Sequence, residues 1–186
     1  MNQQVRIRPA SSGFAPDAFT APEFLLMLDL GSFEDMRVEL AGGVIEKMAP
    51  AHGEHARHNF ELGLKLVDAL GRGAVIATDL ALVVDSETVR GVDIAVAHAQ
   101  FSDGPAHGAD ILLAIEIAET TLSRDLGAKA ADYARAGIET YWVVDLVGHV
   151  VHVMTEPSDG GFAKREVVRF GENLAVPGSD AIIVAG

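Results

Sequence analysis

The sequence contains no cysteine, one tryptophan and two tyrosines, and it has about half as many basic as acidic residues. The absence of cysteine excludes disulfide bonds, thiolate zinc sites and cysteine nucleophiles. Lysine and arginine total 14 against 27 aspartates and glutamates, so the formal net charge is -13. This charge argues against a broadly basic nucleic-acid-binding surface. A nucleic-acid role must therefore depend on local positive charge, on metal ions, or on a groove between two subunits.

Long apolar segments are also missing. No hydrophobic run approaches the length of a membrane span, and the N-terminal stretch MNQQVRIRPASSGFAPDAF lacks the apolar core of a signal peptide. We therefore expect a cytoplasmic protein without membrane association. The 186 residues are 49% hydrophobic and 22% charged, which is typical of a globular domain. We expect an N-terminal arm over residues 1–19 and a single domain over residues 20–186.

Helical and strand patterns mix along this domain. Helices are predicted over 20–31, from about 52 to 70 with Phe60, Leu64 and Val67 at helical spacing, and over 121–136. Strand patterns flank the glycine turn at 42–43 and continue as AVIAT, LALVV, VDIAV, residues 111–118 and TYWVVDL. From residue 147 onward the pattern is that of β-hairpins. The sequence therefore predicts one mixed α/β domain.

One acidic residue interrupts an apolar strand pattern. Residues 111–118 read ILLAIEIA, which is typical of a strand buried on both faces, yet the sixth residue is Glu116. An unpaired carboxylate there would cost several kcal/mol. Asp93 lies in a second apolar strand pattern, VDIAV. If the two strands are neighbours, their carboxylates face each other and require a compensating cation, for which oxygen ligands favour Mg²⁺ or Mn²⁺. Alternatively, each acid lies at a strand end, where it is hydrated or paired with arginine.

A lysine follows this strand on the next predicted helix. Lys129 comes four residues after Asp125, so one interpretation is an exposed ion pair worth about 0.2–0.5 kcal/mol. However, the helix begins directly after the strand that carries Glu116, and the lysine could fold back toward a metal there. In that position it could orient an attacking water or neutralise a charged transition state.

These residues together resemble a known family. The run IEIAETTLSRDLGAKAADYARAGIETYWVVDL, with VDIAV and VELAGGVIEKMAPAHGEHARH before it, resembles the Uma-type restriction endonuclease family of the PD-(D/E)XK nuclease superfamily. The resemblance extends from about Glu39 to Val184. It implies a restriction-endonuclease-like fold, with a mixed central sheet flanked by helices, to which the hairpin patterns add a C-terminal β-hairpin extension. It also implies a metal-dependent phosphodiesterase site.

The resemblance assigns residues to that site. It implies that Asp93 and Glu116 hold Mg²⁺ or Mn²⁺, assisted by the backbone carbonyl of Ile117. Val92 stands where the motif commonly has proline, and Ala118 stands where it has its lysine. In this family the lysine has moved to the following helix, and Lys129 matches that place.

Three further residues are cleft candidates. Glu39 and His55 match family positions near the cleft, although Glu39 could equally be an exposed hairpin acid. Asp125 is expected to orient Lys129 or to balance charge locally. His52, His55 and His58 could suggest a zinc site, but their spacing does not present two imidazoles together. Tyr133 and Trp142 are interpreted as packing residues.

We therefore expect a magnesium-dependent endonuclease that cleaves phosphodiester bonds, with DNA as its substrate. A homodimer is also expected, because one small acidic subunit offers little surface to a duplex and a two-fold pair could act on both strands. Two other functions are compatible with the sequence. The chain could be a non-catalytic or regulatory module that retains the nuclease fold, or a phosphodiesterase acting on RNA or small nucleotides.

Overall fold

The computed structural model describes residues 18–48, 53–101 and 104–186. Most of the expected N-terminal arm, and His52 with it, lie outside the described residues. The helices are α1 (Ala21–Asp29), α2 (Gly53–Leu70), α3 (Leu122–Arg124), the π-helical η2 (Asp125–Lys129) and α4 (Ala130–Arg135), with a 3-10 turn η1 (Gly108–Asp110). The strands are β1 (Val38–Ala41), β2 (Val44–Lys47), β3 (Val75–Asp85), β4 (Thr88–Ala97), β5 (Ala106–His107), β6 (Ile111–Ala118), β7 (Thr140–Asp145), β8 (Val150–Ser158), β9 (Gly161–Arg169), β10 (Asn173–Ala175) and β11 (Ile182–Val184).

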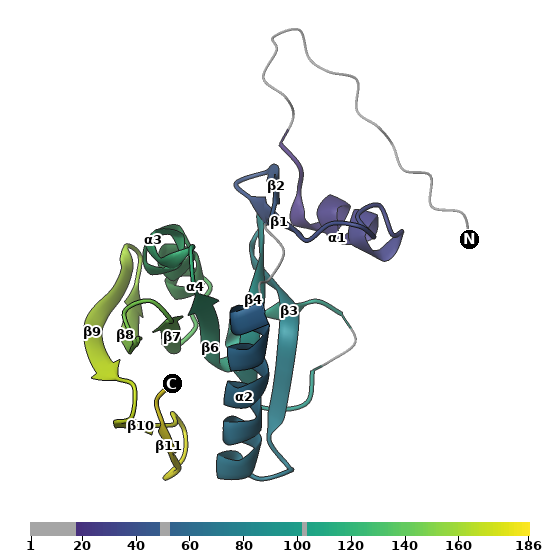
Figure 1. The fold of residues 1–186 in the computed structure, drawn as a ribbon. Coiled ribbons are helices and arrows are strands. Elements are labelled where there is room, and N and C mark those ends of the chain that lie inside the picture. The colour runs from purple at the N-terminus through teal and green to yellow at the C-terminus, as the bar shows by residue number, and fades with distance from the viewer. Residues whose placement is uncertain (1–17, 49–52, 102–103) are drawn as a thin grey trace, which may run out of the picture.

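A mixed sheet forms the centre of the fold, as the sequence predicted (Figure 1). Its strand order is β2-β1-β4-β6-β7-β8-β9, with β3 paired to β4 and β5 paired to β3. Strands β6 and β7 are parallel, whereas β4 and β6 are antiparallel. The C-terminal segments β10 and β11 form a separate two-stranded antiparallel sheet. Within the described ranges, no helix is both long and apolar enough to cross a bilayer.

Local signals near the N-terminal end of the domain are confirmed. Helix α1 begins after Thr20, whose backbone N–H donates to the Glu23 carboxylate at 2.9 Å, and this contact satisfies a donor that the first turn leaves free. The turn between β1 and β2 consists of Gly42 and Gly43, both with positive φ, at +55° and +78°. Two such residues form the turn that matches the twist of a tight hairpin, and glycine adopts this conformation without strain.

The strand prediction for AVIAT and LALVV was wrong in one respect. These stretches form one continuous strand, β3, which runs through Asp79 at φ +52°. Pairing with β4 continues on both sides of Asp79, from Thr78 opposite Ile94 to Leu80 opposite Val92. Aspartate is one of the few residues that adopts a positive φ readily, so the strand tolerates one local distortion without ending.

Helix α2 is present, but its buried face differs from the spacing that the sequence suggested. Phe60 and Leu64 are 66% and 48% exposed, whereas Leu62 and Leu66 are buried. The buried leucines pack against an apolar cluster that includes Trp142. Several apolar residues fall on different sides of this helix, so sequence spacing alone did not select the side that faces the sheet.

Helices cover both faces of the central strands (Figure 1). On β6, Ile115 and Ile117 pack on the α2 side, while Ala114 and Ala118 pack on the α4 side. Side chains alternate along a strand, so Glu116 lies on the α4 side with the two alanines. The pairing of β4 with β6 extends to Ile94 opposite Ile115, and Asp93 and Glu116 are the next residues along these two neighbouring strands.

Candidate active site

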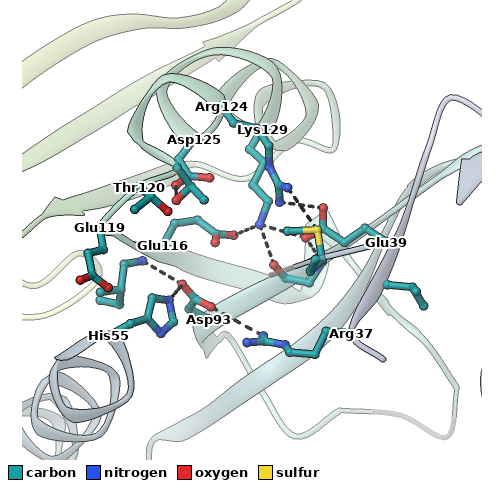
Figure 2. A pocket seen from close by; sticks show the side chains of 15 residues that line it. Arg37, Glu39, His55, Asp93, Glu116, Glu119, Thr120, Arg124, Asp125 and Lys129 are labelled. Carbon is teal, nitrogen blue, oxygen red and sulfur yellow. Dashed lines mark hydrogen bonds and ion pairs between the residues drawn. The ribbon is translucent and has the colours of Figure 1, made fainter. Parts of the chain in front are cut away.

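A pocket of about 120 Å³ opens at the point where β1, β4 and β6 meet the helical segment that follows β6 (Figure 2). The residues that the sequence singled out come from five elements: β1, α2, β4, β6 and the π-helical turn. All of them line this one pocket: Glu39, His55, Asp93, Glu116, Ile117, Asp125 and Lys129. The fold therefore brings every sequence-predicted site residue to a single place, and the two central acids line the same pocket.

Asp93 is buried and has a defined set of hydrogen-bond partners. Its Oδ2 accepts from the backbone N–H of Ile117 at 2.8 Å and lies 3.0 Å from His55 Nε2, while its Oδ1 lies 3.9 Å from Arg37 Nη2. Burial alone would raise the pKa of Asp93, but the hydrogen bonds from His55 and Ile117 outweigh it and lower that pKa. The same hydrogen bond raises the pKa of His55. Asp93 is therefore held as a carboxylate.

Lys129 compensates the buried Glu116. Its Nζ lies 2.9 Å from Glu116 Oε1 and 3.0 Å from Glu39 Oε1, and it donates to the carbonyl of Gly91 at 2.9 Å. Its side chain is only 3% exposed, so the interpretation as an exposed helical ion pair was wrong. The Tyr133 hydroxyl also donates a hydrogen bond to Glu116 Oε1. Complete burial raises the pKa of Glu116 well above its ordinary value, whereas attraction from Glu116 and Glu39 overcomes burial and raises the pKa of Lys129.

Glu39 is the centre of a buried network and is not an exposed hairpin acid. It is 3% exposed and accepts from Arg90 Nη1 and Arg124 Nη2 at 3.0 Å each, and from the Gly91 backbone N–H at 3.1 Å. Burial would raise the pKa of Glu39, but Lys129, Arg124 and Arg90 together lower it. Glu39 therefore remains charged and fixes three cationic side chains at the pocket floor.

The helical segment after β6 has the predicted extent but not the predicted regularity. Between α3 and α4, residues Asp125–Lys129 form a π-helical turn, a feature often found at functional sites. Asp125 and Lys129, at the two ends of this turn, are both buried. Asp125 accepts from the Thr121 hydroxyl at 2.5 Å, and its backbone carbonyl accepts from Tyr141 at 3.0 Å. Its contacts therefore anchor the turn that carries Lys129, rather than the lysine side chain itself.

Several residues of this site were not predicted from the sequence. Tyr133 was interpreted as a packing residue, yet its hydroxyl contacts Glu116; its position four residues after Lys129 on a helix was the available signal. Arg124 is the last residue of α3, directly before the π turn, and also lines the pocket. Arg37 directly precedes β1, and Arg90 lies within β4. No sequence motif indicated either arginine.

The donor set suits a hard divalent cation bound with several waters. Asp93 Oδ2 and Glu116 Oε1 each accept hydrogen bonds. Among the described residues, no donor forms a hydrogen bond with the other oxygen of either carboxylate, Asp93 Oδ1 or Glu116 Oε2. The part of the chain that the structure describes contains no group of three or more histidine, aspartate or glutamate side chains placed to hold a metal. Mg²⁺ is commonly held by one or two carboxylates and keeps several waters, so the two acids fit its requirements.

Comparisons with known proteins point in one direction. The family model Uma2, described as "Putative restriction endonuclease", matches residues 21–180. A crystal structure of a protein described as "a putative nuclease belonging to DUF820" from Anabaena variabilis ATCC 29413 superposes with a TM-score of 0.64 at 18% identity. The match covers 86% of this chain and 89% of that chain, and it shows a shared fold. No curated protein matches this chain.

Proposed function

The chain belongs to the Uma2 family, described as "Putative restriction endonuclease", and on this premise we propose that it is a metal-dependent endonuclease that hydrolyses phosphodiester bonds in DNA. One observation carries the proposal. Asp93 and Glu116, on neighbouring strands, line one pocket together with Lys129, whose buried ammonium lies 2.9 Å from Glu116. Two carboxylates with a lysine at an open pocket are the groups that a metal-assisted phosphodiester hydrolysis requires.

Each residue has a distinct role in this proposal. The carboxylates of Asp93 and Glu116 and the carbonyl of Ile117 would hold Mg²⁺ or Mn²⁺, which supplies a Lewis acid and lowers the pKa of a bound water. Lys129 is fixed by Glu39 and provides positive charge where the phosphate gains negative charge during the reaction. Asp125 and Thr121 hold the π turn in the geometry that directs this lysine inward.

Double-stranded cleavage adds a proposal about assembly. A two-fold homodimer would present one pocket to each strand of a duplex, and it would also enlarge the surface that contacts the DNA. Light scattering of the purified protein, alone and with a short duplex, measures this directly. A strictly monomeric protein in both conditions would limit the activity to nicking of single strands.

The decisive experiment is nicking of supercoiled plasmid DNA with Mg²⁺, with Mn²⁺, and with a chelator. We expect activity with either metal and none with the chelator. Glu116→Ala and Asp93→Asn should each lose at least about a hundredfold in rate. Glu166→Gln is the matched control, because Glu166 lies on β9 with its side chain 57% exposed and should keep wild-type activity.

Metal binding can be measured independently of substrate. Calorimetric titration of Mn²⁺ into the wild-type protein should show binding that Asp93→Asn weakens strongly. Equal nicking by wild type and Glu116→Ala would remove the assigned site. A wild-type protein that neither binds Mn²⁺ nor nicks DNA would favour the non-catalytic module.

A further inference from the structure

Arg37 is the most accessible cation among the described residues that line the pocket. Its side chain is 44% exposed, compared with 28% for Arg124 and 3% for Lys129. It precedes β1 and points across the pocket toward Asp93, which it approaches to 3.9 Å (Figure 2). Exposed cations are scarce in a protein with a net charge of -13, and this one lies beside Asp93 in the pocket.

The other two cations are not available to a new anion. Lys129 and Arg124 each lie 3.0 Å from Glu39, an acid that is almost fully buried. Separating a buried ion pair leaves an uncompensated charge away from water, which is strongly unfavourable. These side chains can contribute charge to a ligand in the pocket, but they cannot move to meet it.

Arg37 has a weaker partner. It pairs with Asp79, whose side chain is 62% exposed, and exposed ion pairs contribute little stability. Asp79 is also the residue of β3 that has a positive φ, +52°. The strand therefore departs from regular geometry at the residue that holds the arginine. A phosphodiester offers two oxygens to the planar guanidinium and could take the place of this carboxylate.

We propose that Arg37 binds a backbone phosphate of the nucleic acid at the mouth of the pocket, next to Asp93, and that Asp79 holds the arginine until the phosphate replaces it. This inference rests on the proposed nuclease function and deepens it by identifying a substrate contact. Asp79 and the nucleic acid then compete for one guanidinium. Removing the charge of Asp79 should consequently tighten binding, whereas removing Arg37 should weaken it.

The test is fluorescence anisotropy with a labelled DNA duplex in the presence of a chelator, which prevents cleavage. We expect Arg37→Ala to weaken binding about tenfold and to reduce the slope of log K against log salt by about one. Arg37→Lys should restore the slope but only part of the affinity, because an ammonium cannot bind two oxygens as a fork. Asp79→Asn should tighten binding severalfold while keeping a residue that accepts positive φ.

Arg57→Ala is the matched control. Arg57 is 48% exposed, close to the value for Arg37, is paired with Glu54 and Glu61 on α2, and is not among the residues that line the pocket. It should leave both affinity and salt slope unchanged. An Arg37→Ala protein with wild-type affinity and slope would overturn the inference, as would an Asp79→Asn protein that binds DNA more weakly.

The outcomes also separate this inference from the proposed function. If the wild type nicks DNA and Glu116→Ala does not, but Arg37→Ala binds normally, the phosphate contact is wrong and the nuclease function stands. If the Arg37 and Asp79 variants change binding as expected but no metal supports nicking, the contact stands and the catalytic function fails. A wild type that binds no DNA overturns both.

Discussion

The floor and the mouth of the pocket use the same kinds of charged groups in opposite ways. At the floor, Lys129 joins Glu39 and Glu116, and all three side chains are 3–5% exposed. At the mouth, Arg37 joins Asp79, and their side chains are 44% and 62% exposed. The first set is removed from water and surrounded by hydrogen bonds, whereas the second lies in contact with solvent.

This difference separates fixed geometry from exchangeable contact. Buried ions that lose a partner cannot be rescued by water, so the floor has one stable arrangement. Exposed ions exchange a protein partner for water or for another anion at little cost. A site that binds and cleaves a charged polymer needs both properties, because its reactive groups must stay in place while its substrate contacts form and break.

Removing the ammonium of Lys129 from the pocket floor should cause the largest loss of stability. Lys129→Met leaves Glu39 and Glu116 buried without their shared ammonium, and we expect it to destabilise the fold by roughly 3–5 kcal/mol. Urea denaturation measures this loss. Lys164→Met, on the exposed surface of β9, should leave the unfolding curve unchanged. A destabilisation by Lys129→Met as small as that of the control would mean that the floor is not an interdependent network.

Neutralising Glu39 should cost somewhat less and should depend on pH. Glu39→Gln keeps the shape of the side chain but removes the charge that three cations share, for a loss of roughly 2–3 kcal/mol at neutral pH. The pKa of Glu39 is lowered in the folded protein from its ordinary value of 4.5. Its stabilising contribution is therefore present above that value and is lost as the pH falls through the lowered folded pKa.

The stability difference between wild type and Glu39→Gln should accordingly shrink in acid. Denaturation curves between about pH 7 and about pH 3 test this dependence. Glu46→Gln is the matched control, because Glu46 lies opposite Glu39 in the register of the β1–β2 hairpin but its side chain is 46% exposed. A difference that is constant with pH would contradict the charged state assigned to Glu39.

A single hydroxyl at the floor gives a smaller and more specific test. Tyr133→Phe removes the donor to Glu116 without changing the packing, and we expect a loss of about 1 kcal/mol with a clear fall in nicking rate. Tyr141→Phe is the control for the loss of a buried hydroxyl in the unfolding measurement, since that tyrosine is equally buried, packs against Tyr133 and donates instead to the carbonyl of Asp125. A Tyr133→Phe protein that nicks DNA at the wild-type rate would remove Tyr133 from the site.

Breaking the Arg37–Asp79 ion pair at the mouth should cause the smallest change in stability. Asp79→Asn breaks the ion pair with Arg37, and we expect the free energy of unfolding to change by less than about 1 kcal/mol. Thermal unfolding followed by circular dichroism measures it. A loss as large as that of Lys129→Met would show that the mouth is as fixed as the floor, and the comparison between them would fail.

Much of the fold was predictable because its signals are local. The capped start of α1, the Gly42–Gly43 turn and the apolar run of β6 each depend on residues close together in the chain. The presence of Glu116 inside that run indicated a compensating group and led to Asp93 and Lys129, whereas Glu39, His55 and Ile117 were assigned from the family resemblance. The π turn was not predicted, because the sequence there reads as an ordinary alanine-rich helix.

The sequence by itself determined that two acids lie in buried strands and that a lysine follows on the next helix. Only the tertiary structure decided which groups meet. Glu39, on β1, reaches Lys129, on the helical segment after β6, and Arg37 meets Asp79 on β3. The physical reason is that burial and charge compensation are set by contacts between distant segments. Hydrophobic patterns specify which residues leave water, but they do not specify which neighbours they find there.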